Sequence, residues 1–221
     1  MSDRYPEVPG SKLEDGGWEE RLRTESTVFR TPTASVIGHT VLYDDERLRT
    51  ALEEAGFGDL LDTEANSSGS RMIDTGEGGG FWRFFFATAL SFRPPLAPGI
   101  GPASMRPTVV SEARRSFEND MRARGFEDVD RGRSQRVRTD SGDRASLVKV
   151  TANYPFENAP TDVLDVEGWI AVWSTGGTFR IAGGVYPIRG LDALLDPLDD
   201  SPGTDPNAYR DELVALIRAV R

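Results

Sequence analysis

The only histidine in the chain, His39, is the first candidate for acid–base chemistry, because an unperturbed imidazole titrates near neutral pH. It stands between Ile37 and Val41, and the two-residue spacing places all three on one face of a predicted strand. The chain has no cysteine, and no serine stands in a nucleophile elbow. Triads assemble in space, so sequence spacing leaves a Ser–His–Asp arrangement open, although no pattern indicates one. His39 is therefore the candidate catalytic residue, with a packed or surface histidine as the alternative.

Two further segments resemble binding sites in composition but not in pattern. The glycine-rich run at 76–80 leads into a strand-like segment and lacks the Gly-Lys-Ser/Thr ending of a phosphate-binding loop. An acidic cluster lacks the terminal glutamate that a calcium loop requires; it consists of Asp196, Asp199, Asp200 and Asp205. We interpret the first as a linker and the second as a solvated, helix-capping loop. The absence of cysteine excludes thiolate metal sites, and we expect neither a metal nor a cofactor.

Positive charge is concentrated on one predicted hairpin, which carries Arg131, Arg133, Arg136, Arg138 and Arg144. Simple alternation would put Arg131 and Arg133 on one face and Arg136 and Arg138 on the other. A nucleic-acid-binding ribbon has its arginines on one face with aromatic residues between them, and neither feature is indicated here. Ion pairing within the hairpin is the simpler interpretation, with Asp128, Asp130, Asp140 and Asp143 as partners. Nucleic acid is therefore disfavoured as a partner.

The segment 94–107 is unusual, because it combines five prolines with the apolar residues Leu96, Ile100 and Met105. Proline restricts the backbone in advance and so lowers the entropy lost when a loop docks. We expect a rigid loop that lines a ligand cleft, meets a partner or covers one end of the core. Together with Trp169 and Trp173 in a later apolar strand, its three apolar residues are the candidates for binding a partner or ligand.

Charge composition limits the range of functions. Asp and Glu number 36 against 26 Lys and Arg, a net charge of −10, and only Lys12 and Lys149 are lysines. This acidity with few lysines is typical of a protein adapted to a salt-rich cytosol, and it repels nucleic acid at long range. The first residues lack the features of a secretory signal, and the longest apolar stretch is far shorter than the roughly 20 residues that span a bilayer. We expect a cytoplasmic protein without a membrane association.

The elements that position these residues follow from the periodicity of apolar side chains. Residues 1–17 are predicted to be a flexible polar tail, and residues 18–221 a single domain. We predict strands at 27–30, 34–43, 81–92, 131–139, 145–154, 168–174 and 178–186. Helices are predicted from Asp44 or Asp45 to Gly56, from Pro107 to Gly125, and after Asp205-Pro206. Short turns between strands imply an α+β fold, an antiparallel β-sheet of about six to seven strands packed by a long central helix and a C-terminal helix.

Two strands have further features that affect packing. The segment 81–92 is apolar on both faces, which favours a central position in the sheet. Gly183 and Gly184 stand inside the last strand, where they indicate a bulge or a close approach of another backbone.

Two apolar stretches resemble uncharacterised proteins of halophilic archaea. They run from Phe84 to Pro98, beginning Phe84-Phe85-Phe86-Ala87-Thr88, and from Gly168 to Pro187, beginning Gly168-Trp169-Ile170-Ala171-Val172-Trp173. The resemblance covers residues 18–221 and implies a lineage but no activity. The order of elements is also similar to the Mog1/PsbP-like fold, whose members mostly act as accessory or binding proteins. At the level of fold alone, that similarity implies a binding role.

Two hypotheses follow, with purely structural self-association as a third possibility. The first is a non-enzymatic cytosolic binding or accessory protein, which docks through the 94–107 loop and the sheet edge near Trp169 and Trp173. The alternative is a small-molecule enzyme, a hydrolase or an isomerase, which uses His39 or carboxylates in a cleft under that loop.

Overall fold

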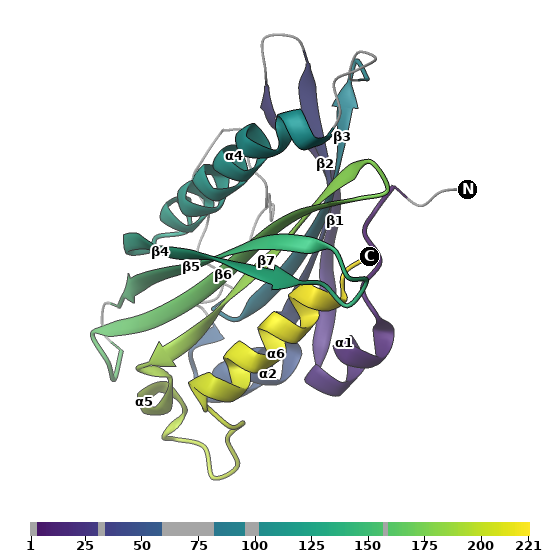
Figure 1. Cartoon of the computed structure of the whole chain (residues 1–221). Helices are drawn as coiled ribbons and strands as arrows, with labels where there is room; N and C mark the ends of the chain where they lie inside the picture. The colour runs from purple at the N-terminus through teal and green to yellow at the C-terminus, as the bar shows by residue number, and fades with distance from the viewer. Residues whose placement is uncertain (1–3, 31–33, 59–81, 96–101, 157–158) are drawn as a thin grey trace.

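One antiparallel sheet organises the part of the chain that the computed structural model describes, residues 4–30, 34–58, 82–95, 102–156 and 159–221 (Figure 1). Its seven strands lie in the order β1-β2-β3-β7-β6-β5-β4. They are β1 (Trp18–Arg30), β2 (Ser35–Asp45), β3 (Phe84–Arg93), β4 (Glu127–Arg138), β5 (Arg144–Pro155), β6 (Val163–Thr175) and β7 (Thr178–Arg189). Every pair of neighbouring strands is antiparallel, which confirms the predicted fold class.

The helices of the described residues are α1 (Gly10–Gly16), α2 (Glu46–Glu54), α4 (Pro102–Ala123), α5 (Leu191–Leu195) and α6 (Pro206–Ala219) (Figure 1). The long helix α4 and the C-terminal α6 cover opposite faces of the sheet. Phe117 of α4 packs on Phe86, with ring centroids 5.8 Å apart, and the Gly183 position faces the same Phe86 ring. The next residue, Gly184, points to the other face and meets Leu213 of α6. None of these helices is long and apolar enough to cross a membrane.

Strand β3 occupies the middle of the sheet, as its apolar sequence predicts. It pairs with β2 on one side and with β7 on the other. Phe84, Phe85 and Phe86 are each no more than 1% exposed, although they point alternately to the two faces. Burial of both faces is the physical reason that this strand carries almost no polar residue before Ser91.

Predicted helix-terminal residues have the expected geometry. The Asp45 carboxylate accepts hydrogen bonds from the N–H groups of Arg47 and Leu48, at 3.1 and 3.2 Å, and so caps α2. Gly56 follows α2 with a φ of +88°, in the left-handed region that glycine favours. Asp205 caps α6 through the N–H of Asn207 at 2.9 Å. The predicted starts of both helices are confirmed.

The N-terminal segment differs from the predicted polar tail. Gly10–Gly16 form α1, and β1 begins at Trp18, well before the predicted strand at 27–30. The main chain of Glu7 also exchanges two hydrogen bonds with Arg221, at 3.2 and 3.0 Å. Strand β1 escaped prediction because it is an edge strand, in which charged residues replace the apolar alternation.

The proline-rich segment is helical in part. Residues 102–107 belong to α4, which begins at Pro102 rather than Pro107. By sequence, both Pro102 and Pro107 suit the first turn of a helix, where a residue needs no N–H donor. The predicted start at Pro107 is therefore wrong by one proline. Leu96 and Ile100 lie outside the described residues, whereas Met105 lies in α4 and packs, half-buried, against the core.

Trp169 and Trp173 are not at a sheet edge, contrary to the predicted docking surface. Their strand, β6, lies between β7 and β5. The two side chains are 7% and 0% exposed, so they are core residues. Their apolar surroundings were predicted correctly, but strand order is a property of the whole sheet and does not follow from one strand.

Gly184→Ala should destabilise the fold, because an added Cβ would lie 2.1 Å from the main-chain oxygen of Phe84 and 2.8 Å from Leu213 Cδ1. Such overpacking costs roughly 1–3 kcal/mol, occasionally more. Urea-induced unfolding measures the loss. Gly203→Ala is the control, since nothing lies within 4 Å of its Cβ position, and it should change stability by less than about 0.5 kcal/mol. Equal losses in both variants would contradict the close approach of β3 and β7.

Candidate functional site

His39 lines a cleft of about 490 Å³. The cleft lies at the end of β3 where the strand is no longer fully buried, from Ser91 onward. The cleft is lined by Arg4, His39, Ala89, Leu90, Ser91, Phe92, Arg93, Thr178 and Arg180. In the register of β1 with β2, Glu25 stands opposite His39. In the register of β2 with β3, His39 stands opposite Ala89, two residues before Ser91. Glu25, His39 and Ser91 therefore share one face of three neighbouring strands.

The imidazole of His39 connects a carboxylate and a hydroxyl. Its Nε2 lies 3.1 Å from Ser91 Oγ, and its Nδ1 lies 3.5 Å from Glu25 Oε2. The residue is 3% exposed, and the edge of the Tyr5 ring packs against it. Burial lowers the pKa of His39 below 6.5, and this effect outweighs the opposing Glu25 carboxylate. The imidazole is therefore neutral at neutral pH and can accept a proton.

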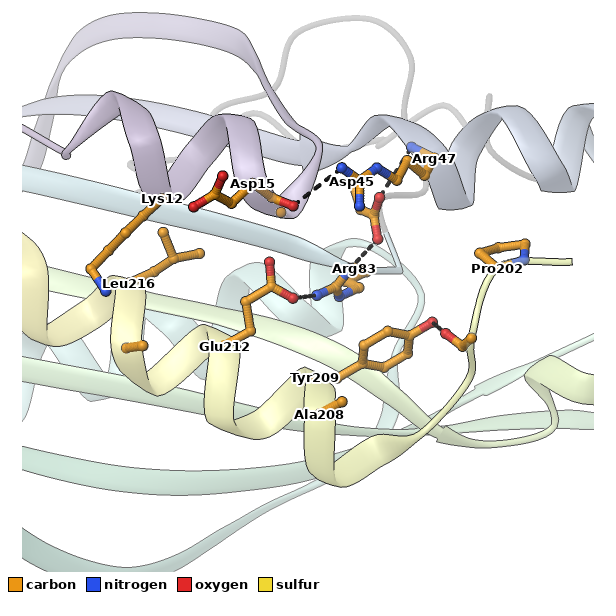
Figure 2. A pocket seen from close by; sticks show the side chains of 13 residues that line it. Lys12, Asp15, Asp45, Arg47, Arg83, Pro202, Ala208, Tyr209, Glu212 and Leu216 are labelled. Atoms are coloured by element: carbon orange, nitrogen blue, oxygen red, sulfur yellow. Dashed lines mark hydrogen bonds and ion pairs between the residues drawn. The ribbon is translucent and has the colours of Figure 1, made fainter.

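A second cleft, of about 420 Å³, surrounds the buried cation Arg83 (Figure 2). Its guanidinium group binds the carboxylates of Asp45 and Glu212. It also lies over the rings of Tyr209 and Trp18, at 4.1 and 4.8 Å from their centroids. These contacts come from β1, β2 and α6, and Arg83 directly precedes β3, so the cation joins these elements. Because every charge has a partner, we interpret this group as structural.

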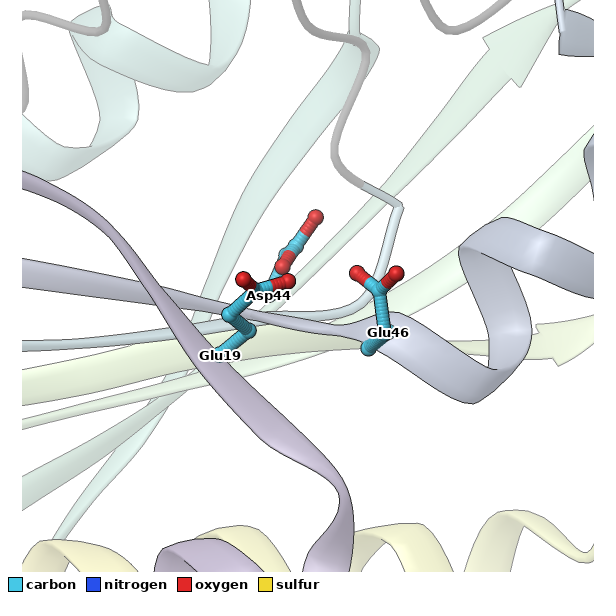
Figure 3. A group of neighbouring side chains, drawn as sticks. All are labelled: Glu19, Asp44 and Glu46. Atoms are coloured by element: carbon cyan, nitrogen blue, oxygen red, sulfur yellow. The ribbon is translucent and has the colours of Figure 1, made fainter.

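Three carboxylates near the start of α2 could hold a metal ion by their spacing alone. Oxygen atoms of Glu19, Asp44 and Glu46 lie within 4.8 Å of one another (Figure 3). Arg21 already binds Asp44 at 2.7 Å and also binds Glu46, and Arg49 lies 3.2 Å from Asp44. These two guanidinium groups compensate most of the negative charge, and a cation would have to displace them. We therefore assign the cluster to ion pairing.

An arginine groove of about 690 Å³ lies between α4 and the β4–β5 hairpin. It is lined by Arg106, Pro107, Val110, Arg114, Ser134, Arg136, Arg144, Ala145 and Ser146, none of which is acidic. Arg114 donates hydrogen bonds to Ser134 Oγ at 3.0 Å and to Ser146 Oγ at 2.8 Å. Arg106 donates to the main-chain oxygen of Arg144 at 2.9 Å. Desolvation, reinforced by nearby Arg131 and opposed by Glu118, lowers the pKa of Arg114.

A β-bulge brings more arginines to the groove side than simple alternation predicts. Arg131 pairs with Val150, whereas Ser134 pairs with Val148, so β4 contains one extra residue between them. The partners of Arg131, Ser134 and Arg136 all have even numbers and share one face of β5. The predicted separation of Arg131 from Arg136 is therefore wrong. Gly132 within the arginine run was the sequence signal for this bulge.

The predicted ion pairs within the hairpin are not observed among the described residues. Arg131 binds Glu118 of α4 at 2.6 Å instead, and Asp140 lies 3.6 Å from Arg218 of α6. The side chains of Arg136 and Arg144 have neither a hydrogen-bond nor an ion-pair partner in the described part of the chain. Two positive groups therefore face the groove without compensation.

Arg83→Met should lower the free energy of unfolding by about 3–5 kcal/mol, because it leaves the carboxylates of Asp45 and Glu212 without a cation. Arg189→Met removes an ion pair whose arginine side chain is 74% exposed, and it should cost less than about 1 kcal/mol. Chemical denaturation measures the loss of unfolding free energy in the two variants. Adding Asp45→Asn and Glu212→Gln to Arg83→Met should restore part of the loss. No recovery would mean that lost ring packing, not unpaired charge, causes the effect.

Comparison with known proteins agrees with the extent of the fold. A search of curated proteins finds no match. Among protein families, a domain of unknown function, DUF6517, matches residues 5–221, which include α1, the groove, the second cleft and all of the first cleft's lining except Arg4. The chain therefore belongs to the DUF6517 family.

Proposed function

We propose that this protein is a binding protein whose arginine groove holds a small oxyanion with more than one negative charge. The carrying observation is the composition of the groove, in which four arginines and two serines stand without a carboxylate. Placing like charges together is unfavourable, and this chain has 36 acidic residues with which to compensate them. Elsewhere the buried Arg83 is held by two carboxylates. An anionic ligand supplies the missing charge here.

The chemistry of the groove suits phosphate-like groups. A guanidinium group presents a planar set of donors that matches two oxygens of a phosphate or carboxylate. The hydrogen bonds of Arg114 to Ser134 and Ser146 hold one guanidinium group in place before a ligand binds. The side chains of Arg136 and Arg144 can then close on the ligand. A volume of about 690 Å³ is in the range of small-molecule sites.

A small ligand is favoured over a nucleic acid, because the net charge of −10 repels a long polyanion. No aromatic residue lines the groove on which a base could stack. This proposal retains the binding role predicted from the sequence but moves it away from Trp169 and Trp173. Docking through Leu96 and Ile100, a cytosolic location and a halophilic origin stay predictions.

The alternative prediction, a small-molecule hydrolase or isomerase that uses His39, also stays open. One observation favours a hydrolase, namely the 3.1 Å between His39 Nε2 and the hydroxyl of Ser91.

Calorimetric titration with pyrophosphate at fixed ionic strength tests the binding proposal. The wild-type protein should release or absorb heat with a defined stoichiometry, and Arg114→Gln and Arg136→Gln should each weaken binding about tenfold or more. The expected size follows from the roughly 1.5–3 kcal/mol that a hydrogen bond to a charged group contributes. Thermal unfolding of each variant checks that it is folded.

Arg115→Gln is the matched control, because it removes the same charge from the next position of α4. The Arg115 side chain is 65% exposed and binds Glu112 at 3.2 Å, outside the groove. It should bind pyrophosphate as the wild type does. The proposal fails if pyrophosphate does not bind, or if Arg115→Gln weakens binding as much as Arg114→Gln. Binding of a single-stranded oligonucleotide but not of pyrophosphate would assign the groove to nucleic acid instead.

A further inference from the structure

A carboxylate, an imidazole and a hydroxyl form a line across β1, β2 and β3, at a site separate from the arginine groove. Glu25, His39 and Ser91 come from three strands whose antiparallel pairing places them on one face. Ser91 is half-buried and lines the cleft of about 490 Å³, so its hydroxyl can be reached by a small molecule. His39 is buried behind it, and Tyr5 restricts the imidazole ring.

The order of the three groups matches the roles in nucleophilic catalysis. A serine hydroxyl needs a base within hydrogen-bonding reach, and His39 Nε2 lies 3.1 Å from Ser91 Oγ. The base needs a third group to orient it, and Glu25 Oε2 lies 3.5 Å from Nδ1. Nδ1 makes no hydrogen bond in the described residues, so Glu25 acts on the imidazole through its charge; a proton on Nδ1 leaves Nε2 free to accept the serine proton. We infer that Ser91, His39 and Glu25 form a catalytic triad that hydrolyses small esters carrying a negative charge.

The charge of the substrate follows from the wall of the cleft. Arg4, Arg93 and Arg180 line it, and no acidic residue does. Arg93 and Arg4 contact Glu25, at 2.8 and 3.8 Å, which leaves them less able to bind an anion. Arg180 instead binds the main-chain oxygen of Arg221 and neighbouring groups of β7, and no Asp or Glu side chain pairs with it in the described residues. Its positive charge is available to a carboxylate or phosphate of the substrate.

An oxyanion in this cleft would depend on side chains. Ser91 stands inside the β2–β3 ladder opposite Ile37, so its neighbouring main-chain donors serve the sheet. The guanidinium group of Arg180, which Glu25 does not hold, takes the place of main-chain N–H groups in stabilising the negative oxygen. The same wall of the cleft therefore binds the charged group of the substrate and stabilises the oxyanion.

The reaction uses water as its second substrate. Ser91 Oγ attacks the ester carbonyl carbon while its proton moves to His39 Nε2. The bond from that carbon to the alcohol oxygen then breaks, and the alcohol leaves with the proton. A water molecule attacks the acyl group on Ser91, giving one proton to His39. The free acid departs, and the proton returns to Ser91 Oγ, which restores the site.

Labelling with a fluorophosphonate probe tests the nucleophile on the full chain. Ser91 should displace fluoride and gain the phosphonyl mass, located by peptide mass spectrometry. Ser91→Ala should abolish the label, and His39→Gln should slow it about 100-fold or more. Ser174→Ala, in β6 outside the cleft, should be labelled at the wild-type rate. Labelling of another serine, or of none under conditions that label a known serine hydrolase, would overturn the proposal.

Because the chain has no cysteine, Ser91→Cys introduces a single thiol and gives a second measurement. That thiol should react with iodoacetamide at least tenfold faster than free cysteine, and adding His39→Gln should remove the advantage. A rate equal to that of free cysteine would show that His39 does not activate this position.

Hydrolysis of two nitrophenyl esters tests the substrate class. The ester with a terminal carboxylate, 4-nitrophenyl hemisuccinate, should have the higher kcat/KM when compared with 4-nitrophenyl acetate. Arg180→Gln should lower kcat for both esters, because the oxyanion loses its donor, and raise KM about tenfold for the hemisuccinate alone. Preference for the acetate, or no turnover of either ester, would refute the proposal. The Arg114→Gln variant separates the two sites, since loss of pyrophosphate binding should leave ester hydrolysis intact.

Discussion

Burial of β3 on both faces decides where polar chemistry can occur in this molecule. Every residue from Phe84 to Leu90 is buried, and exposure begins only at Ser91. A buried polar group needs a partner, and the hydroxyls of Thr40 and Thr88, 2.8 Å apart, supply one to each other in the middle of the sheet. The hydroxyl of Ser91 is available to a ligand because it lies where β3 is no longer fully buried. His39 lies at this boundary, shielded from water but adjacent to the cleft.

Two classes of arginine differ in whether carboxylates neutralise their positive charge. Arg83, Arg21 and Arg49 are each held by two or more carboxylates, so they join elements and have no charge to offer a ligand. Those of the groove donate to hydroxyls or main-chain oxygens, or have no described partner. In a chain rich in acidic residues, the arginines without a carboxylate partner are the ones that indicate a binding surface. Uncompensated charge marks a binding surface more specifically than the arginine count does.

The fold followed from sequence more readily than the sites. Apolar runs and caps identified β3, α2 and α6, because those signals are local. The start of α4 was ambiguous, since Pro102 and Pro107 both suit a first turn. His39 was recognised by its residue type, but Glu25 and Ser91 were not, because strand register alone makes them its neighbours. The groove was missed for a related reason: tertiary packing alone brings Arg106 and Arg114 of α4 next to the β4–β5 hairpin.

The two edges of the sheet share an irregularity that has a consequence for solubility. Strand β4 contains two one-residue bulges, and β1, at the opposite edge, also contains two. A regular, exposed edge would present main-chain groups to which a strand of another molecule could pair. Bulges and dense charge distort that template at both edges. The extra residue that puts Arg131 on the same face as Arg136 therefore also helps the sheet to end at its seventh strand instead of continuing into a neighbouring copy.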